Sequence, residues 1–141
     1  MSQTHPQSAK GFSLLELMVV VGVFGVLVAA SVPAISGSIR TARREGAAAT
    51  LAADLRYARS LASAQRKTYQ VSFGANAYSL NLVSPPTVVR TRTLPRGVTF
   101  GSSSTATFYA WGLTQPATIT VADHKSSNTV RLAANGSVSN E

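Results

Sequence analysis

The sequence contains no cysteine among its 141 residues, which excludes disulfide frameworks and thiolate metal sites. Acidic residues are scarce as well: five Asp and Glu stand against 13 Lys and Arg, for a formal net charge of +8. This balance favours an acidic partner, whether nucleic acid, anionic lipid or another protein. The basic residues are spaced along the chain, so they do not form a disordered basic tail.

Side chains suited to catalysis or metal binding are also few. The two histidines, His5 and His124, lie in a polar N-terminal stretch and a polar turn, and they support neither a metal site nor a catalytic triad. The acidic residues form no spaced carboxylate pair, and the serines have no evident base beside them. We therefore expect no enzymatic activity, no cofactor and no metal.

Charge is missing altogether from residues 17–39, a stretch of 23 residues. As a helix it would be about 35 Å long, enough to cross a bilayer. Glu16 lies just before it, inside the apolar run that begins at Phe12. A carboxylate in the hydrocarbon layer costs about 2.5–3.5 kcal/mol on insertion scales, so its presence needs a reason. A secretory signal peptide has a shorter apolar region and is disfavoured, whereas a plain membrane anchor stays open.

The chain after this stretch is predicted to continue as a helix. Residues 40–67 are rich in Ala, Leu and Arg, which are good helix formers. One apolar stripe is formed by Leu51, Leu55, Ala58 and Ala62. Only Pro33 interrupts the pattern, which predicts one helix of roughly 55 residues: a transmembrane first half (12–39) and an amphipathic second half (40–67).

The apolar period changes to two after residue 67, which is typical of strands. Alternating stretches occupy residues 68–73, 77–83, 87–94, 98–100, 106–111, 118–122 and 129–133, and Asn135-Gly136 marks one more turn before the tail. The pattern predicts an α+β fold. In this fold the long helix packs on a C-terminal antiparallel β-sandwich of about seven short strands, within a globular domain of residues 68–141.

The segment GFSLLE (11–16), followed by an apolar helix, resembles the processing site of the type IV pilin-like and pseudopilin family. In that family a prepilin peptidase at the cytoplasmic face removes a short leader and methylates the new N-terminus. The resemblance implies that residues 1–11 are a leader peptide, that the cut falls between Gly11 and Phe12, and that Phe12 becomes N-methylphenylalanine.

Two residues of the apolar segment, Glu16 and Pro33, match the family pattern as assembly positions. After cleavage, the amine of Phe12 would be a cation at the start of the helix, buried in the core of a fibre. A carboxylate one turn along can neutralise that amine on an adjacent subunit and offset the cost of desolvating both groups. Such an ion pair would explain why a carboxylate is present at Glu16 despite its cost in the hydrocarbon layer.

The stretch LAADLRYARSLASAQRKTYQVSF (51–73) resembles the helix-to-strand junction of GspH/FimT-type minor pseudopilins, with Leu55, Ala58 and Arg59 in a Leu-x-x-Ala-Arg-like pattern. FYAWGLTQPATITV followed by TVRLAANGSV resembles their C-terminal half. The resemblance implies a structural minor pilin at or near the tip of a type II secretion pseudopilus or a type IV pilus, where it helps to initiate assembly. The implied partners are other pilin or pseudopilin subunits, the prepilin peptidase and inner-membrane lipid.

Membrane orientation is taken from the same resemblance. The positive-inside rule compares Lys10 with Arg40, Arg43 and Arg44 and would leave the C-terminal domain in the cytoplasm. The peptidase instead requires a cytoplasmic N-terminus. The resemblance thus implies a single-pass bacterial inner-membrane protein with a periplasmic domain, which then enters the fibre. The three arginines are expected to contact lipid phosphates.

A DNA-binding minor pilin acting in natural transformation is the alternative. Some FimT-like minor pilins bind DNA through a basic tail with a Gly-Arg-x-Arg pattern, but the matching stretch 136–139 has serine in place of each arginine. Arg90, Arg92 and Arg96 are clustered in the sequence, and the first two should share one strand face, so they are candidate anion or DNA contacts. Alternatively, these arginines lie on a solvent-exposed face and pair with a neighbouring subunit.

Overall fold

The computed structural model describes residues 12–102 and 105–140, without the side chains of residues 32–35. One helix is followed by eight strands: α1 (Leu14–Gln65), β1 (Tyr69–Phe73), β2 (Ala77–Leu82), β3 (Thr87–Thr93), β4 (Thr99–Ser102), β5 (Ala106–Phe108), β6 (Ala117–Ala122), β7 (Ser127–Leu132) and β8 (Val138–Asn140). The chain divides into two compact units, Met1–Gly37 and Ser38–Glu141. The second unit holds all of the strands.

The end of α1 follows the expectation of a helix that runs to about residue 67. Arg66 takes the left-handed conformation (φ 52°) that ends many helices, a position where glycine is usual. The backbone N–H of Lys67 then donates to the carbonyl of Ala62 at 3.2 Å, which satisfies one of the last helical acceptors. With these contacts the chain turns directly into β1.

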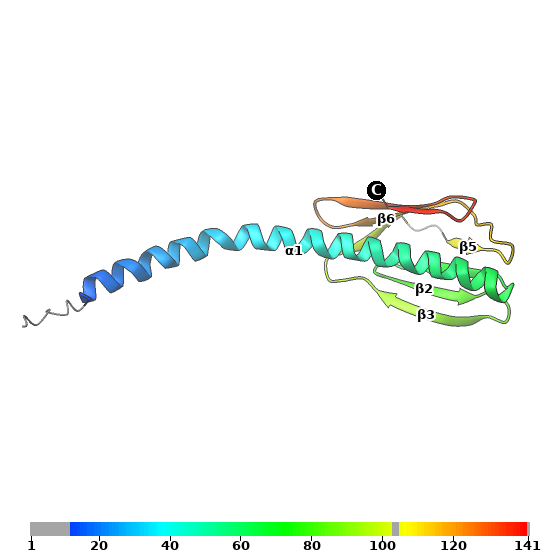
Figure 1. Cartoon of the computed structure of the whole chain (residues 1–141), viewed down its shortest axis with the longest axis horizontal. Helices are drawn as coiled ribbons and strands as arrows, with labels where there is room; N and C mark the ends of the chain where they lie inside the picture. Colours follow the sequence, from blue (N-terminus) through cyan, green and yellow to red (C-terminus); the bar gives the residue numbers. More distant parts are fainter. Residues whose placement is uncertain (1–11, 103–104, 141) are drawn as a thin grey trace, which may run out of the picture. The chain divides into compact units, whose positions relative to one another are not determined.

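The strands form two antiparallel sheets of four, in the orders β3-β2-β1-β5 and β4-β6-β7-β8. The hairpin of β1 and β2 pairs Tyr69 with Leu82 and Phe73 with Tyr78, on either side of the turn that the sequence predicts at residues 74–76. Figure 1 shows the C-terminal half of α1 running alongside strands of both sheets. The predicted α+β fold, a long helix packed on short antiparallel strands, is confirmed.

A single cluster of buried apolar side chains joins α1 to both sheets. The helix contributes Ala47, Ala48, Leu51, Ala52, Leu55, Ala58 and Ala62. The predicted stripe is confirmed, since its four members are each 0% exposed. Phe108 of β5 is the largest fully buried side chain among the described residues. The second sheet contributes Ile119 and Val130, which are also fully buried. Because five of the seven helix residues in this cluster are alanine, both sheets can approach the helix backbone closely.

The strands differ from the expectation by one or two residues at most of their ends, and in two larger respects. The strand predicted at 106–111 ends at Phe108, because a turn follows in which Tyr109 and Leu113 are hydrogen-bonded and Gly112 has φ +84°. The residues after the Asn135-Gly136 turn form β8, so the described part of the chain has eight strands rather than about seven. Three polar-flanked residues give too short an alternation to be recognised from sequence alone.

Candidate functional site

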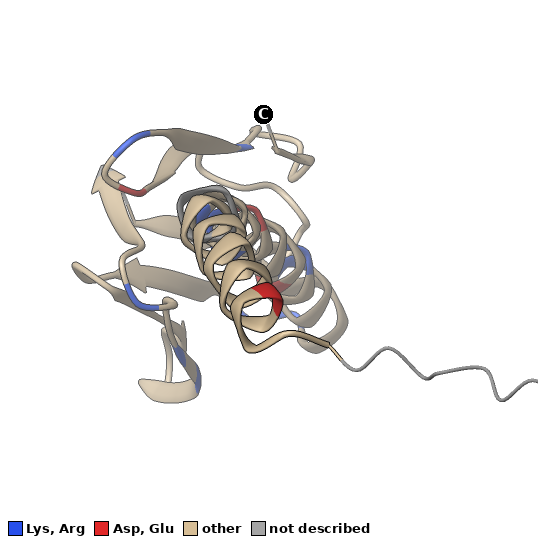
Figure 2. Cartoon of the chain, turned by 90° about the vertical axis from the view of Figure 1, so that its left-hand side faces the viewer, with Lys and Arg blue, Asp and Glu red and all other residues tan. Residues whose placement is uncertain are grey.

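The N-terminal half of α1 exposes its apolar side chains. Every described side chain from Phe12 to Ser31 is exposed, including Leu14, Val21, Phe24 and Val28. The helix is long and apolar enough to cross a membrane. Figure 2 shows one acidic position near the start of this helix. Exposed apolar surfaces of this size mark sites of contact with a membrane or with other proteins.

Glu16 lies exposed in the first turn of α1. A carboxylate is favourable there because the first turn carries the positive end of the helix dipole. Ser13 precedes the helix, its carbonyl accepts from the N–H of Leu17 at 3.1 Å, and Ser13 and Glu16 have the spacing of a capping box. Glu16 therefore has a local structural role available besides the predicted assembly contact.

The other residues of the predicted processing and assembly sites are placed only in part. Gly11 lies outside the described residues. Phe12 begins the described chain just before α1 and is 81% exposed, so it would be accessible to an enzyme. Pro33 lies within α1, where its missing N–H leaves the carbonyl of Ala29 without the usual helical donor. The side chain of Pro33 lies outside the described residues.

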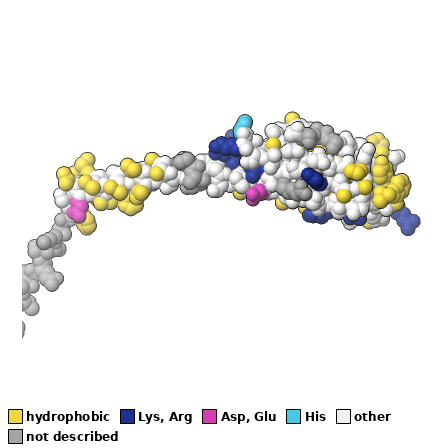
Figure 3. Space-filling view, turned by 90° about the horizontal axis from the view of Figure 1, so that it is seen from above, with side chains coloured by type: hydrophobic (Ala, Val, Ile, Leu, Met, Phe, Trp, Pro, Cys, Tyr) yellow, Lys and Arg dark blue, Asp and Glu magenta, His cyan; other side chains and the backbone are white. Residues whose placement is uncertain are grey.

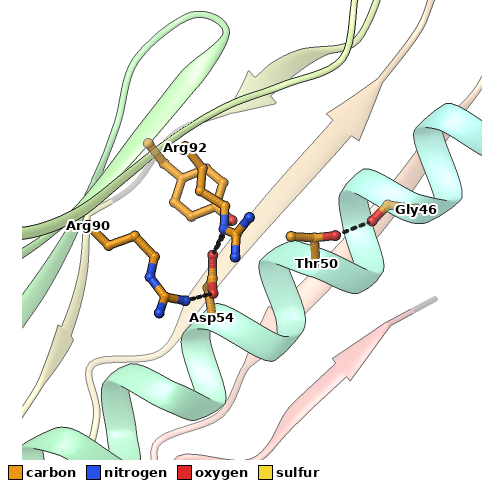
Figure 4. A network of polar contacts seen from close by, with 6 residues as sticks. Gly46, Thr50, Asp54, Arg90 and Arg92 are labelled. Carbon is orange, nitrogen blue, oxygen red and sulfur yellow. Dashed lines mark hydrogen bonds and ion pairs between the residues drawn. The ribbon is translucent and has the colours of Figure 1, made fainter.

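Asp54 of α1 is the centre of a polar network that joins the helix to the first sheet (Figure 4). Its side chain is only 8% exposed. One carboxylate oxygen accepts a hydrogen bond from Nη1 of Arg90 at 2.8 Å. The other accepts from Nε of Arg92 at 2.7 Å and from the hydroxyl of Tyr78 at 2.7 Å. The predicted shared face of Arg90 and Arg92 is confirmed, because both side chains reach the same carboxylate.

The charges of these two arginines are therefore engaged within the domain. Arg90 also lies over the ring of Tyr57, with its guanidinium carbon 4.7 Å from the ring centroid, which is a cation–π contact. Burial and the hydrogen bond to Asp54 raise the pKa of Tyr78, so the phenol stays protonated and donates. This network, which we call the Asp54 network, is built as a structural contact between α1, β2 and β3.

Arg96 does not join Arg90 and Arg92. It lies in the turn between β3 and β4 and lines a different hollow, together with Arg40, Arg43 and His124. Sequence proximity suggested one cluster of three arginines, but the chain turns at Pro95 and takes Arg96 to another place. The sequence interpretation also missed Asp54. Its position, three residues after Leu51 and within the apolar stripe, was a signal that it would be buried.

A second polar contact, the Arg44 latch, joins α1 to the turn between β6 and β7. Arg44 is 9% exposed, and its Nη1 lies 3.1 Å from Oδ2 of Asp123. Its Nε donates to Oδ1 of Asn128. The expectation that Arg44 contacts lipid phosphate is wrong, because its guanidinium is buried and already paired. Arg40 and Arg43 are exposed, as that expectation requires.

Two further arginines of α1 bind the last hairpin. Nη1 of Arg59 donates to the carbonyl of Gly136 at 3.2 Å, and Nη2 of Arg56 donates to the carbonyl of Val138 at 3.1 Å. Both acceptors belong to the hairpin of β7 and β8. Since no carboxylate is involved, these contacts fasten the C-terminal strand to the helix without neutralising either charge.

Acid is expected to weaken the Arg44 latch. Hydrogen bonds from the backbone N–H groups of Lys125 and Ser126, together with Arg44, lower the pKa of Asp123. A carboxyl group with a lowered pKa stabilises the folded chain above its ordinary pKa of about 3.9, and this contribution is lost as the pH falls through the lower value. The free energy of unfolding of the wild type should therefore fall more between about pH 5 and about pH 2 than that of Asp123→Asn.

Urea denaturation followed by circular dichroism at a series of pH values measures this difference. Asp123→Asn lacks the titrating carboxyl group, but its side-chain carbonyl can still accept a hydrogen bond. It is therefore the matched control for the wild type. Parallel curves for the two proteins would show that Asp123 does not link the fold to acid.

Comparison with known families matches both halves of the chain. Residues 6–32 match the family described as the prokaryotic N-terminal methylation motif. Residues 47–136 match the family described as type II transport protein GspH. The second match covers α1 from residue 47 onward and the strands β1 to β7. No curated protein sequence matches the chain.

Solved structures share the fold. Two crystal structures of the type IV minor pilin FimU from Pseudomonas aeruginosa superpose with TM-scores of 0.59 and 0.58, at 20% and 19% sequence identity. Each alignment covers 69% of this chain and 87% or 91% of the FimU chain. At this level of identity the likeness establishes the architecture, and the site residues rest on the geometry described above.

Proposed function

Because this chain belongs to the GspH family of type II transport proteins, we propose that it is a structural minor subunit of a pilin-type fibre. The fibre is a type II secretion pseudopilus or a type IV pilus, and the subunit lies at or near its tip, where it helps to initiate assembly. The observation that carries the proposal is the exposed apolar half of α1, which continues directly from a matched N-terminal methylation motif into a GspH domain.

The proposed maturation uses the beginning of α1. A prepilin peptidase hydrolyses the bond between Gly11 and Phe12 at the cytoplasmic face of the inner membrane and methylates the new amine. The exposed position of Phe12, just outside the first helical turn, suits this reaction. The apolar segment then holds the subunit in the inner membrane, with residues after about 40 in the periplasm, until it enters the fibre among other pilin or pseudopilin subunits.

Nucleic acid as a partner receives less support than fibre assembly. In the DNA-binding alternative the candidate phosphate contacts are Arg90, Arg92 and Arg96, which would have to be free to pair. Arg90 and Arg92 both bind Asp54, and Arg96 lies apart from them. A soluble DNA duplex that shifted with this protein in a gel at low salt, and failed to shift with an Arg90→Ala/Arg92→Ala/Arg96→Ala variant, would restore the DNA-uptake alternative.

Replacing Gly11 by leucine is expected to block maturation and, with it, fibre entry. The resemblance places this glycine next to the scissile bond, where a bulky side chain would keep the backbone from the peptidase. Mass spectrometry of the chain from membranes should show wild type beginning at methylated Phe12 and Gly11→Leu retaining the leader. In a deletion strain, wild type but not Gly11→Leu should restore the fibre.

The same strain separates the two fibre types when protein secretion and twitching are scored together. Loss of secretion alone assigns a pseudopilus, and loss of twitching alone assigns a type IV pilus. The proposal is wrong if the deletion leaves both intact, or if Gly11→Leu complements as well as wild type does.

A further inference from the structure

We propose that the hollow lined by Arg40, Arg43, Arg96 and His124 is a phosphate-binding site that holds the headgroup of an anionic phospholipid at the membrane surface. We call it the basic hollow. The inference rests on the proposed membrane anchoring and adds a specific ligand class to it. It also assigns a use to three arginines that neither the Asp54 network nor the Arg44 latch engages.

The basic hollow is formed by three segments that are far apart in the sequence. Arg40 and Arg43 lie on α1, Arg96 lies in the turn between β3 and β4, and His124 lies in the turn between β6 and β7. The cavity has a volume of about 120 Å³. Figure 3 shows basic side chains gathered beside a histidine on one face of the molecule. The fold therefore brings together three arginines that the sequence distributes over 57 residues, from Arg40 to Arg96.

The turn that carries Arg96 is well defined. The N–H of Val98 donates to the carbonyl of Pro95 at 3.1 Å, and Gly97 has φ +84°. A positive φ at the third position is the requirement of a type II turn, which glycine meets without strain. The turn holds Arg96 between the buried side chains of Leu94 and Val98, so its position relative to the helix is fixed.

The positive charge of the hollow is not neutralised by the domain. Within residues 12–102 and 105–140 no ion pair engages Arg40, Arg43 or Arg96. Asp123 is the one carboxylate that lines the hollow. Its oxygens are taken by Arg44 and by the backbone N–H groups of Lys125 and Ser126. The Arg44 latch thus compensates Asp123 and leaves the three exposed arginines available to an external anion.

The depth of the hollow suits a lipid headgroup. Ile39 is the last residue of the charge-free stretch, and a helical rise of 1.5 Å per residue puts Arg40 and Arg43 about 1.5 Å and about 6 Å further along α1. The headgroup region adds about 5–7 Å to each side of the hydrocarbon core. Arg96 and His124 line the same hollow as Arg43. Arginine forms bidentate hydrogen bonds with phosphate, which favours this ligand over a carboxylate surface.

The test compares lipids bound to the full mature chain in uncharged detergent micelles. Native mass spectrometry measures binding of phosphatidylglycerol, which is anionic, and of phosphatidylcholine, which is zwitterionic. We expect clear preference for phosphatidylglycerol. In Arg43→Gln/Arg96→Gln its affinity should fall about 25-fold, because each basic residue near an anionic surface contributes about fivefold. Arg66→Gln/Lys67→Gln removes the same charge from exposed residues at the other end of α1 and should bind as wild type does.

Inorganic phosphate distinguishes a lipid site from a general anion site. His124 is the only histidine outside the predicted leader, so its ring resonances in NMR spectra report on the hollow without assignment of other histidines. A shift of these resonances with inorganic phosphate, without any preference between the two lipids, would overturn the lipid assignment. No lipid preference and no shift would overturn the site itself.

Processing and membrane extraction of the same variants separate this inference from the proposed function. Arg43→Gln/Arg96→Gln should still be cut before Phe12 and should still need detergent for extraction. If the wild type is neither cut nor held in the membrane, the proposed function fails and the lipid site fails with it. If both are normal while lipid preference is absent, the lipid site alone is wrong.

Discussion

Replacing Asp54 by alanine should lower the free energy of unfolding by about 2–3 kcal/mol. Removing one partner of a buried ion pair costs about 3–5 kcal/mol, and the cost is smaller here because the remaining arginines can be rehydrated. Arg90 and Arg92 have side chains that are 39% and 46% exposed. The hydroxyl of buried Tyr78 would also lose its acceptor. Thermal unfolding followed by circular dichroism should show the midpoint falling by on the order of 10–15 °C.

Two variants control the interpretation of that loss. Glu45→Ala removes the same charge from an exposed position of the same helix and should change stability by less than about 0.5 kcal/mol. Asp54→Asn keeps an acceptor and the shape of the side chain but not the charge, so its loss should lie between the other two. If Asp54→Ala is no less stable than Glu45→Ala, the Asp54 network does not hold the first sheet to the helix.

Replacing Glu16 by glutamine should reduce incorporation into fibres by at least tenfold while leaving processing and membrane insertion intact. In the proposed fibre, the amine of Phe12 is removed from water. Leaving such a cation without its carboxylate costs about 3–5 kcal/mol, which exceeds a tenfold change in equilibrium. Fibres sheared from cells and probed by immunoblotting, with the membrane fraction as reference, measure the incorporated share.

Glutamine is chosen because it separates the two roles available to Glu16. Either Glu or Gln can complete a capping box with Ser13, so the helix start is preserved in Glu16→Gln. Glu16→Ala removes both the charge and the side chain that could complete the capping box. Equal loss of incorporation in both variants assigns the effect to the charge. Normal incorporation of Glu16→Gln with loss in Glu16→Ala would mean that Glu16 serves only the helix end.

The fold could be predicted from sequence wherever a local pattern is long. The charge-free run 17–39, the apolar stripe from Leu51 to Ala62 and the hairpin at 69–82 each repeat one period often enough to be recognised. The short strand β8 could not be, because its three residues repeat the period too few times, although it pairs with the neighbouring strand β7. The contacts of Arg56 and Arg59 with this hairpin join residues some 80 positions apart, and contacts over such a distance have no signature in a short window.

The candidate sites also divide into those that a local sequence motif predicts and those that depend on the folded domain. Gly11 and Phe12 belong to a local motif, which sequence alone can present. The local sequence could not predict which arginines are buried and paired. Arg44 is buried against Asp123, while its neighbour Arg43 is exposed. Whether an arginine pairs with Asp54 or Asp123 depends on how the helix and the two sheets pack together in the folded domain. Charge counted along the chain therefore overstated the cluster at 90–96 and missed the hollow that includes Arg96.

The spacing of the polar contacts along α1 has a mechanical consequence. Arg44, Asp54 and Arg59 bind three different parts of the two sheets, over 15 residues of helix or about 22 Å. A pull along the helix axis loads all three in parallel, so none has to rupture before the others bear force. In the proposed fibre, force on the subunit would pass along this helix, and the domain would be held to the helix at several points along its length.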